Sequence, residues 1–328
     1  MLLSDRYRIL QKIGVGGCGE VFLAKDIHLP SEPKCVVKQF KPSTSDPADY
    51  QLIKDKFKQE AAILEIVGHH DQIPQLYAFF EENGELYIVQ QYIEGLTLAQ
   101  KVKQDGVFDG NFVRDFLICL LPVISFIHSE NIIHRDIKPD NIILRKEDGM
   151  PVLIDFGVVK DLEETIVNGQ YSQTKVYSEG YTALEQIGGF PVFSSDLFSL
   201  GMTAIFMLTG KNSKDLHNKS LNKVDWIQGL PNFNTGNGFP IDLELSETIS
   251  KAILDKNERF SNAEEMKRAV YFGVNKKIRR ILFHTPYMLK VEEETEVKVD
   301  NSASKFEMEE YLPTDGEYQR CISWKVNK

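Results

Sequence analysis

The hydrophobic pattern of this 328-residue chain changes near residues 91–95. Before this point, short β-branched and aromatic runs separated by turn residues predict strands. After it, two long segments are apolar almost all round, which is typical of buried helices. The predicted strands fall within residues 7–40, 76–80 and 86–93, and the predicted buried helices span residues 111–130 and 195–209. We therefore expect an α+β fold with a β-rich N-lobe, a short connector and a helical C-lobe.

Composition narrows the class of protein. The chain is 42% hydrophobic and 26% charged, and its formal net charge of −10 argues against a general nucleic-acid or anionic-membrane binder, which needs a basic face. The four cysteines, at positions 18, 35, 119 and 321, have no Cys-x-x-Cys spacing, which favours free thiols in a reducing cytosol. We expect no signal peptide and no membrane span, because the longest apolar run, residues 117–127, is short. These observations predict a soluble, cytoplasmic protein.

The most distinctive chemistry lies in residues 134–141, with the sequence His-Arg-Asp-Ile-Lys-Pro-Asp-Asn. Asp136 can activate a hydroxyl, Lys138 can neutralise a transferring phosphate, and Asn141 can hold a metal ion. Nineteen residues after Asp136, the carboxylate of Asp155 opens an Asp-Phe-Gly sequence and can hold a second metal ion. These side chains at short, fixed offsets indicate phosphoryl transfer.

A glycine-rich segment lies between the first two predicted strands. Glycines let backbone N–H groups approach phosphate oxygens closely. The G-x-G-x-x-G pattern can equally mark a dinucleotide site, but that site needs a helix after the last glycine, whereas residues 20–24 predict a strand. The expected phosphate loop consists of Gly14, Val15, Gly16, Gly17, Cys18 and Gly19. Lys38 ends the third predicted strand in an apolar run, where its ammonium group must find an anion.

Together these motifs resemble the catalytic core of eukaryotic-type protein kinases over residues 7–273. Residues 70–76 and 89–95 resemble the cyanobacterial type of bacterial serine/threonine kinase. The resemblance implies the bilobal protein-kinase fold. It does not cover the C-terminal tail, for which two alternatives stay open: a disordered tail, or a tail that packs on the kinase domain. The expected domains are a kinase domain over residues 1–274, with the N-lobe about 1–93 and the C-lobe about 94–274, and a tail over residues 275–328.

The resemblance also implies catalytic roles. Asp136 would accept the proton of the substrate hydroxyl or orient that hydroxyl, and Lys138 would stabilise charge on the γ-phosphoryl group of ATP. Asn141 and Asp155 would hold Mg²⁺, or Mn²⁺, between the phosphates. Positioning and electrostatics would supply most of the rate acceleration.

Nucleotide-binding roles follow from the same resemblance. Lys38 would contact the α- and β-phosphates and pair with Glu60, on a helix expected over residues 51–67; a surface position for Glu60 is the alternative. Gln90 would be the gatekeeper residue. The adenine pocket would be lined by Val21, Val36, Gln90, Ile93 and Ile143 or Ile154, with backbone hydrogen bonds from Gln91 and Ile93.

Several structural roles are implied around residues 134–141, the catalytic loop. Glu185 should pair with Arg259 as a buried ion pair, and Asp196 should brace the backbone of the loop. His134 is expected to be structural rather than a general base. Leu184 stands where the family usually has proline, so it adds a backbone donor and is expected to loosen the turn.

The resemblance places an activation segment over residues 155–185. Thr174 falls at the usual phosphorylation position, where Arg135 would read the phosphate, and an ordinary loop threonine is the alternative. Ser178 fits a position where a hydroxyl contacts the catalytic Asp and Lys.

The sequence therefore predicts an ATP- and Mg²⁺-dependent serine/threonine protein kinase that autophosphorylates on its activation segment. Its expected partners are ATP, proteins with Ser or Thr hydroxyls, and a transient homodimer for phosphorylation in trans. Two alternatives remain: a catalytically weak kinase-like scaffold or pseudokinase, and a small-molecule phosphotransferase. The presence of Lys138 and Ser178 speaks against the second alternative.

Overall fold

The computed structural model describes residues 1–16, 19–41, 46–156, 180–218, 223–224, 226–230 and 241–271. All of these residues belong to one compact unit, Met1–Gly273. The predicted tail, together with Gly17, Cys18, Thr174 and Ser178, lies outside the described residues.

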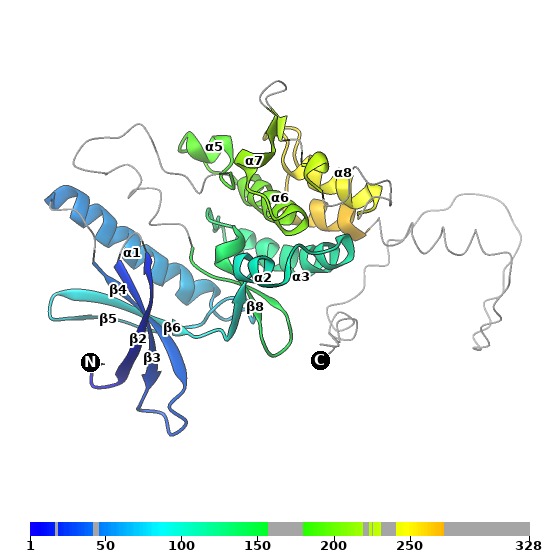
Figure 1. The fold of residues 1–328 in the computed structure, drawn as a ribbon. Helices are drawn as coiled ribbons and strands as arrows, with labels where there is room; N and C mark the ends of the chain where they lie inside the picture. Colours follow the sequence, from blue (N-terminus) through cyan, green and yellow to red (C-terminus); the bar gives the residue numbers. More distant parts are fainter. Residues whose placement is uncertain are drawn as a thin grey trace, which may run out of the picture. The chain divides into compact units, whose positions relative to one another are not determined.

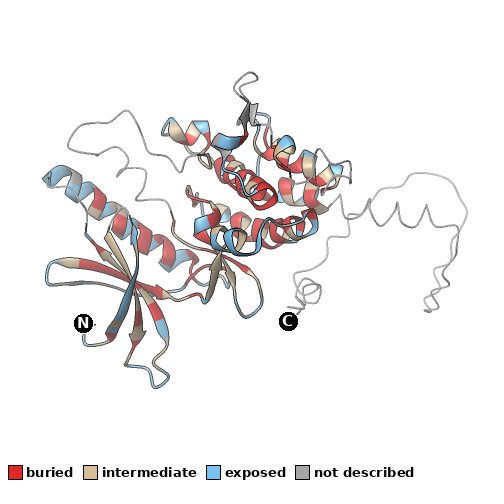
Figure 2. Cartoon of the chain, in the orientation of Figure 1, coloured by how far each residue is buried: buried red, intermediate tan, exposed pale blue. Residues whose placement is uncertain are grey.

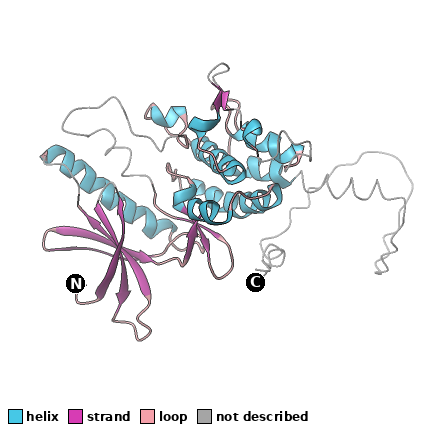
Figure 3. Ribbon diagram, viewed as in Figure 1, coloured by secondary structure: helices cyan, strands magenta, loops and turns pink. Residues whose placement is uncertain are grey.

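The N-terminal part is built on a six-stranded antiparallel sheet (Figures 1 and 3). Its strands, in spatial order, are β1 (Leu2–Leu3), β2 (Tyr7–Gly16), β3 (Gly19–Asp26), β4 (Lys34–Phe40), β6 (Glu85–Gln91) and β5 (Leu76–Glu82). The strand predictions are confirmed, although β1 was not predicted. Asn83 and Gly84, between β5 and β6, both have positive φ, at 52° and 82°, which is typical of a two-residue hairpin turn.

Gly19 is required at the start of β3. Its φ is +152°, and a Cβ atom at this position would lie 1.9 Å from the carbonyl oxygen of Gln39 on β4. At Gly14, by contrast, the nearest atom to an added Cβ would be the Cβ of Val21, at an ordinary 3.7 Å. Close pairing of β3 with β4 therefore requires glycine at position 19, whereas position 14 has room for a Cβ atom.

Gly19→Ala is expected to lower the free energy of unfolding by at least about 1–3 kcal/mol, the range for a residue forced into a sparsely populated backbone conformation. Gly14→Ala serves as the matched control and should stay within about 1 kcal/mol, the span of strand propensities. Urea unfolding of both variants measures the difference. Equal losses of stability would contradict this account of β3.

One helix, α1 (Pro47–Val67), packs on this sheet (Figure 1). Phe57, Ala61 and Leu64 are all buried, which confirms the apolar face that their spacing predicts. They join a hydrophobic core that continues into the helices of the C-terminal part. Figure 2 shows the buried side of α1 and the largely buried α3 and α6.

The C-terminal part is mainly helical (Figure 3). A small three-stranded sheet, ordered β7-β8-β9, was not predicted from the sequence. Residues 263–271 are also helical. The elements are β7 (Gly95–Thr97), α2 (Leu98–Asp105), α3 (Gly110–Ser129), η1 (Pro139–Asn141), β8 (Ile142–Arg145), β9 (Pro151–Leu153), α5 (Leu184–Ile187), α6 (Phe193–Thr209), α7 (Ser213–Leu216), β10 (His217–Asn218), β11 (Lys223–Val224), η2 (Ile227–Gly229) and α8 (Leu243–Ala252).

The helix α3 is long and apolar enough to cross a membrane, the one such helix in the described part of the chain. Most of its apolar stretch is buried inside the unit, where Val113, Leu117, Leu120 and Ile124 have no exposed surface. Burial in the core therefore accounts for its composition.

Two of the predicted free thiols, Cys35 and Cys119, are unbridged and buried. Burial raises the pKa of each to about 11, which keeps them protonated and unreactive.

Candidate active site

A lysine and two carboxylates from three separate elements meet at one point. Lys38 on β4 places its Nζ 2.5 Å from an oxygen of Glu60 on α1 and 2.5 Å from an oxygen of Asp155, which follows β9. The Lys38 side chain is 12% exposed and that of Glu60 is 9% exposed, whereas Asp155 is 38% exposed. The expectation that Glu60 points inward to Lys38 is confirmed, and its alternative surface position is excluded.

The two carboxylates keep Lys38 charged. Burial alone would lower the pKa of Lys38, but the negative charges of Asp155 and Glu60 outweigh it and raise the pKa above its ordinary value. Lys38 therefore presents a fixed positive charge beside a half-exposed carboxylate. Such a charge can attract a phosphate group, and Asp155 can hold a cation that binds the same phosphate.

The loop between α3 and β8 brings three predicted residues together. Asp136 is 4% exposed, and Lys138 places its Nζ 3.2 Å from the Asp136 carboxylate. The side-chain amide of Asn141, at the end of η1, donates to the Asp136 carbonyl oxygen at 2.9 Å and also to its carboxylate. These bonds point the amide nitrogen of Asn141 at Asp136, so a metal ion at this side chain would meet the amide oxygen.

The oxygen donors fit a magnesium-type cation. Mg²⁺ in nucleotide sites is held by one or two carboxylates together with substrate phosphates. Asn141 and Asp155 supply an amide oxygen and a half-exposed carboxylate, and they lie at the two ends of the β8–β9 hairpin. Among the described residues, no group of three or more His, Cys, Asp or Glu side chains is placed to hold a metal ion. The described residues would therefore hold a cation through Asn141 and Asp155 alone, and substrate phosphates and water would supply its other ligands.

Asp196 at the start of α6 holds the backbone of the catalytic loop. Its carboxylate has no exposed surface and accepts hydrogen bonds from the backbone N–H groups of His134 and Arg135, both at 2.9 Å. The predicted brace is confirmed. Two partners were not predicted: the ring of His128 lies 2.8 Å from Asp196, and the side-chain amide of Gln186 donates to the Arg135 carbonyl at 2.7 Å. No motif marks either residue.

His134 packs inside the protein, as expected for a structural residue. It has no exposed surface, and its ring centroid lies 4.6 Å from that of Phe156, the residue after Asp155. Its ring nitrogen Nδ1 accepts from the backbone N–H of Asp136 at 3.3 Å. His134 therefore connects the catalytic loop to the segment that carries Asp155.

The predicted ion pair between Glu185 and Arg259 is confirmed. Nη1 of Arg259 lies 2.7 Å from Glu185, and the hydroxyl of Ser195 donates to the same carboxylate oxygen at 2.7 Å. Burial alone would raise the pKa of Glu185, but the hydrogen bonds from Arg259 and Ser195 outweigh it and hold the pKa below its ordinary value of 4.5. The pair ties α5 to α6 and the segment before residue 263.

Glu185→Gln is expected to cost about 3–5 kcal/mol of unfolding free energy near pH 7, because it leaves the buried Arg259 without its charged partner. A carboxyl whose pKa is lowered in the folded state contributes stability above its unfolded pKa and loses it as the pH falls. The wild-type protein should therefore lose this contribution as the pH falls from about 4.5 through the lower folded-state pKa, and the variant should not. Asp105→Asn, which breaks an exposed α2 pair with Lys101, is the control and should cost under about 1 kcal/mol.

The structure gives the backbone position of Leu184, while the looser turn expected there stays a prediction. It is the first residue of α5, after the cap residue Ala183, and its side chain is 74% exposed. The backbone N–H at the first helical position has no partner within the helix, which is why proline is common there. Replacing proline with leucine at this position therefore adds a donor that the helix does not need to bind.

Most of the residues predicted to line the adenine pocket come from β3, β4, β6 and the segment directly after β6. Val36 pairs in register with Gln90, and Val21 pairs with Lys38. Gln90 and Ile93 are buried. The backbone N–H of Gln91 donates to the carbonyl oxygen of Gln75 at 2.9 Å, and Gln91 pairs in register with Cys35 of β4. In the phosphate loop, Val15 is 74% exposed, and Gly16 pairs with Gly19 across the β2–β3 hairpin.

This combination of a β-rich sheet, a helical part and a Lys–Glu–Asp cluster beside an Asp–Lys–Asn loop defines a phosphotransferase domain of the protein-kinase type. The protein kinase domain family matches residues 7–272, and the chain belongs to this family. The predicted bilobal α+β kinase fold is confirmed.

The relatives and the solved structures agree with this assignment. Serine/threonine-protein kinase PknA of Nostoc sp. is 47% identical over 279 residues, covering 83% of this chain and 48% of the relative. Serine/threonine-protein kinase C of Synechocystis sp. is 47% identical over 272 residues, covering 81% and 49%. The chain spans about half the length of these relatives.

Two solved structures share the fold. The structure titled "PpkA-294 apo form" has a TM-score of 0.66 at 24% identity, covering 81% of this chain and 96% of that one. The PknI kinase domain of Mycobacterium tuberculosis has a TM-score of 0.59 at 21% identity, covering 81% and 95%. At these identities the likeness concerns the fold alone.

Proposed function

We propose that this chain is a serine/threonine protein kinase that transfers the γ-phosphoryl group of ATP to Ser or Thr hydroxyls of proteins. The observation that carries the proposal is the position of Lys38, whose ammonium group lies 2.5 Å from both Glu60 and Asp155. This arrangement links the nucleotide-facing sheet, α1 and the Asp-Phe-Gly segment in the geometry that phosphoryl transfer requires.

Each residue has a defined task in the proposal. Lys38, oriented by Glu60, holds the α- and β-phosphates, while the carbonyl of Gln91 and the N–H of Ile93 bind the adenine between Val21 and Val36. Residues 14–19 cover the phosphates. Asn141 and Asp155 would hold a Mg²⁺ or Mn²⁺ ion, which would supply positive charge against the phosphates.

The acceptor side of the reaction belongs to the catalytic loop. Asp136 accepts the hydroxyl proton or orients the hydroxyl for in-line attack, and its position is fixed by the bond from Asn141. Lys138, 3.2 Å from Asp136, moves to stabilise charge on the transferring group. A lysine at this offset favours Ser and Thr over Tyr as acceptors, in line with the names of the relatives.

The wider proposal concerns regulation and context. The kinase domain spans residues 1–274 and the tail residues 275–328, and the domain acts in the cytoplasm. Thr174 is phosphorylated in trans within a transient homodimer, which orders the activation segment. A catalytically weak kinase-like scaffold or pseudokinase is the second candidate.

Identification of the labelled amino acid tests the substrate class. The purified chain is incubated with γ-labelled ATP, Mg²⁺ and a generic basic protein, and the labelled residues are mapped by mass spectrometry. Label on Ser or Thr, including Thr174 of the chain itself, is expected. Label confined to Tyr, or label only on small-molecule acceptors, would overturn the proposed class.

A further inference from the structure

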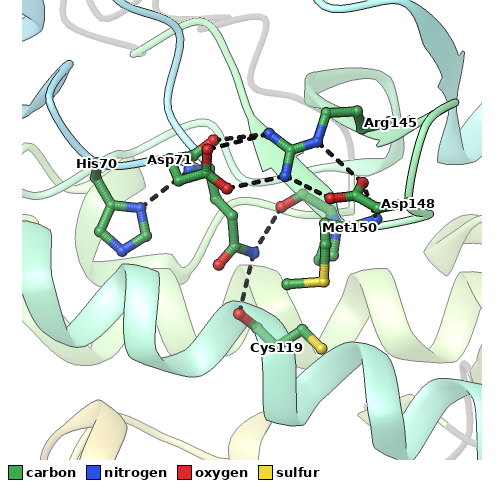
Figure 4. Close-up of polar contacts among 8 residues, drawn as sticks. His70, Asp71, Cys119, Arg145, Asp148 and Met150 are labelled. Atoms are coloured by element: carbon green, nitrogen blue, oxygen red, sulfur yellow. Dashed lines mark hydrogen bonds and ion pairs between the residues drawn. The ribbon is translucent and has the colours of Figure 1, made fainter. Parts of the chain in front are cut away.

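Two polar anchors connect the loop after α1 to the β8–β9 hairpin. The first is Arg145, the last residue of β8 (Figure 4). Its guanidinium donates to both carboxylate oxygens of Asp148 at 2.9 and 2.6 Å. It also donates to the Asp71 carboxylate at 2.9 Å and to the Asp71 carbonyl at 3.1 Å. Because all three guanidinium nitrogens are used, Arg145 fixes the loop and the hairpin turn in one geometry.

The second anchor is Gln72, which is 9% exposed. Its side-chain amide nitrogen donates to the carbonyl of Pro151 at 2.8 Å and to the carbonyl of Cys119 at 3.2 Å. Its own backbone carbonyl accepts from the N–H of Leu153 at 2.9 Å. A single residue thus bonds to β9 twice and to α3 once, and burial makes the loss of these bonds costly.

The position of the hairpin gives these anchors a connection to the active site. The β8–β9 hairpin begins directly after Asn141 and ends two residues before Asp155. The anchored loop, residues 70–73, follows α1, which carries Glu60. A hydrogen bond joins Gln72 to Leu153, and ion pairs join Asp155 to Lys38 and Lys38 to Glu60. The loop after α1 is therefore connected back to α1 through the hairpin, Asp155 and Lys38.

The loop and the end of α1 are closely packed. Gly68, between α1 and the loop, would place a Cβ atom 2.5 Å from the Leu64 carbonyl oxygen. The rings of His69 and His70 pack against Phe126 of α3 at 5.2 and 5.1 Å. Ile73 is 1% exposed. The C-terminal end of α1 is thus held against α3 and the hairpin.

We propose that Gln72 and Arg145 are positioning residues, which keep Glu60 and Lys38 in register with Asp155 by holding the loop after α1 on the β8–β9 hairpin. The inference rests on the proposed kinase function for its effect on rate. Neither residue touches the substrate. Loss of either anchor lets α1 move relative to the hairpin, and a misplacement of about 1 Å can cost about 10²-fold in rate.

The test begins with Gln72→Leu, which keeps side-chain bulk but removes both donors. We expect kcat to fall about 10- to 100-fold, with the KM for ATP changed less than about threefold. Thr248→Val is the matched control, because it removes a buried hydrogen bond of α8 to Glu244, remote from the site. An equal loss of kcat in the control, or no loss in Gln72→Leu, would overturn the proposal.

Hydrogen exchange gives a readout that needs no turnover. The Leu153 amide donates to the backbone carbonyl of Gln72, and its hydrogen should exchange faster in Gln72→Leu than in the wild type. Its exchange rate should be unchanged in Thr248→Val. Unchanged exchange in Gln72→Leu would overturn the anchor itself, whereas a wild-type chain without transfer activity would overturn only the proposed function.

Arg145 provides an independent arm. Arg145→Met should lower kcat about 10-fold and Arg145→Lys should restore little, since an ammonium group cannot reproduce the paired bonds to Asp71 and Asp148. Lys251→Met, which breaks the α8 pair with Glu265, is the control and should leave kcat unchanged. Wild-type kcat in Arg145→Met would remove Arg145 from the proposal.

Discussion

Asp136→Asn is expected to lower the rate of phosphoryl transfer by about 10²–10⁴-fold, the contribution of a positioned proton acceptor. The asparagine keeps the shape of the side chain and can still accept the hydrogen bond from Asn141. It loses the basic carboxylate and the ion pair with Lys138. Because Asp136 does not belong to the Lys38–Glu60–Asp155 cluster, affinity for ATP should change by less than about threefold.

Steady-state transfer rates and ATP titrations of the two proteins check this result. Asp105→Asn, an exposed carboxylate on α2, is the control and should keep the wild-type rate. A wild-type rate in Asp136→Asn would show that the catalytic loop is not the acceptor site. A loss of ATP affinity equal to the loss of rate would show that the variant disturbs binding rather than the chemical step.

Lys38→Met is expected to have the second largest effect. It removes the cation between two carboxylates, so Glu60 is left buried beside Asp155 without the positive charge of Lys38. We expect transfer to fall by at least about 10²-fold, because the phosphates lose their fixed positive charge. The free energy of unfolding should also fall by about 3–5 kcal/mol, the usual result of removing one member of a buried ion pair.

Transfer assays and urea unfolding measure the two effects separately. Lys25→Met on β3 removes a partly exposed lysine from the same sheet and should change stability by less than about 1 kcal/mol. Transfer by Lys38→Met within about threefold of wild type would contradict the role of the cluster. Unchanged stability would show that the charge of Glu60 does not depend on Lys38 for its compensation.

Short-range chemistry was predictable from the sequence. Asp136, Lys138 and Asn141 lie within six residues of one another, so the chain itself brings them together. Lys38 and Asp155 are 117 residues apart, and no local pattern places them in contact. The direct contact between Lys38 and Asp155 was not predicted. The pairing of Lys38 with Glu60 was predicted through the resemblance to a family, as were Glu185 with Arg259 and the brace by Asp196.

Other features could not be predicted, for physical reasons. The strands β7, β8 and β9 have three or four residues each, too few for alternation to be recognised. Gln72, Gln186 and Arg145 act through backbone carbonyls and loop carboxylates, and such contacts depend on the fold rather than on spacing. The position of Leu184 at the start of α5 was also not evident, because a helix of four residues leaves no periodic pattern in the sequence.

Turnover by the purified chain tests the central claim most directly. Transfer of the γ-phosphate from ATP·Mg²⁺ to the chain and to a generic basic protein is measured beside the affinity for ATP. We expect multiple turnovers of phosphate transfer that require the divalent cation. A folded chain that binds ATP but transfers no phosphate would contradict it and identify a kinase-like scaffold.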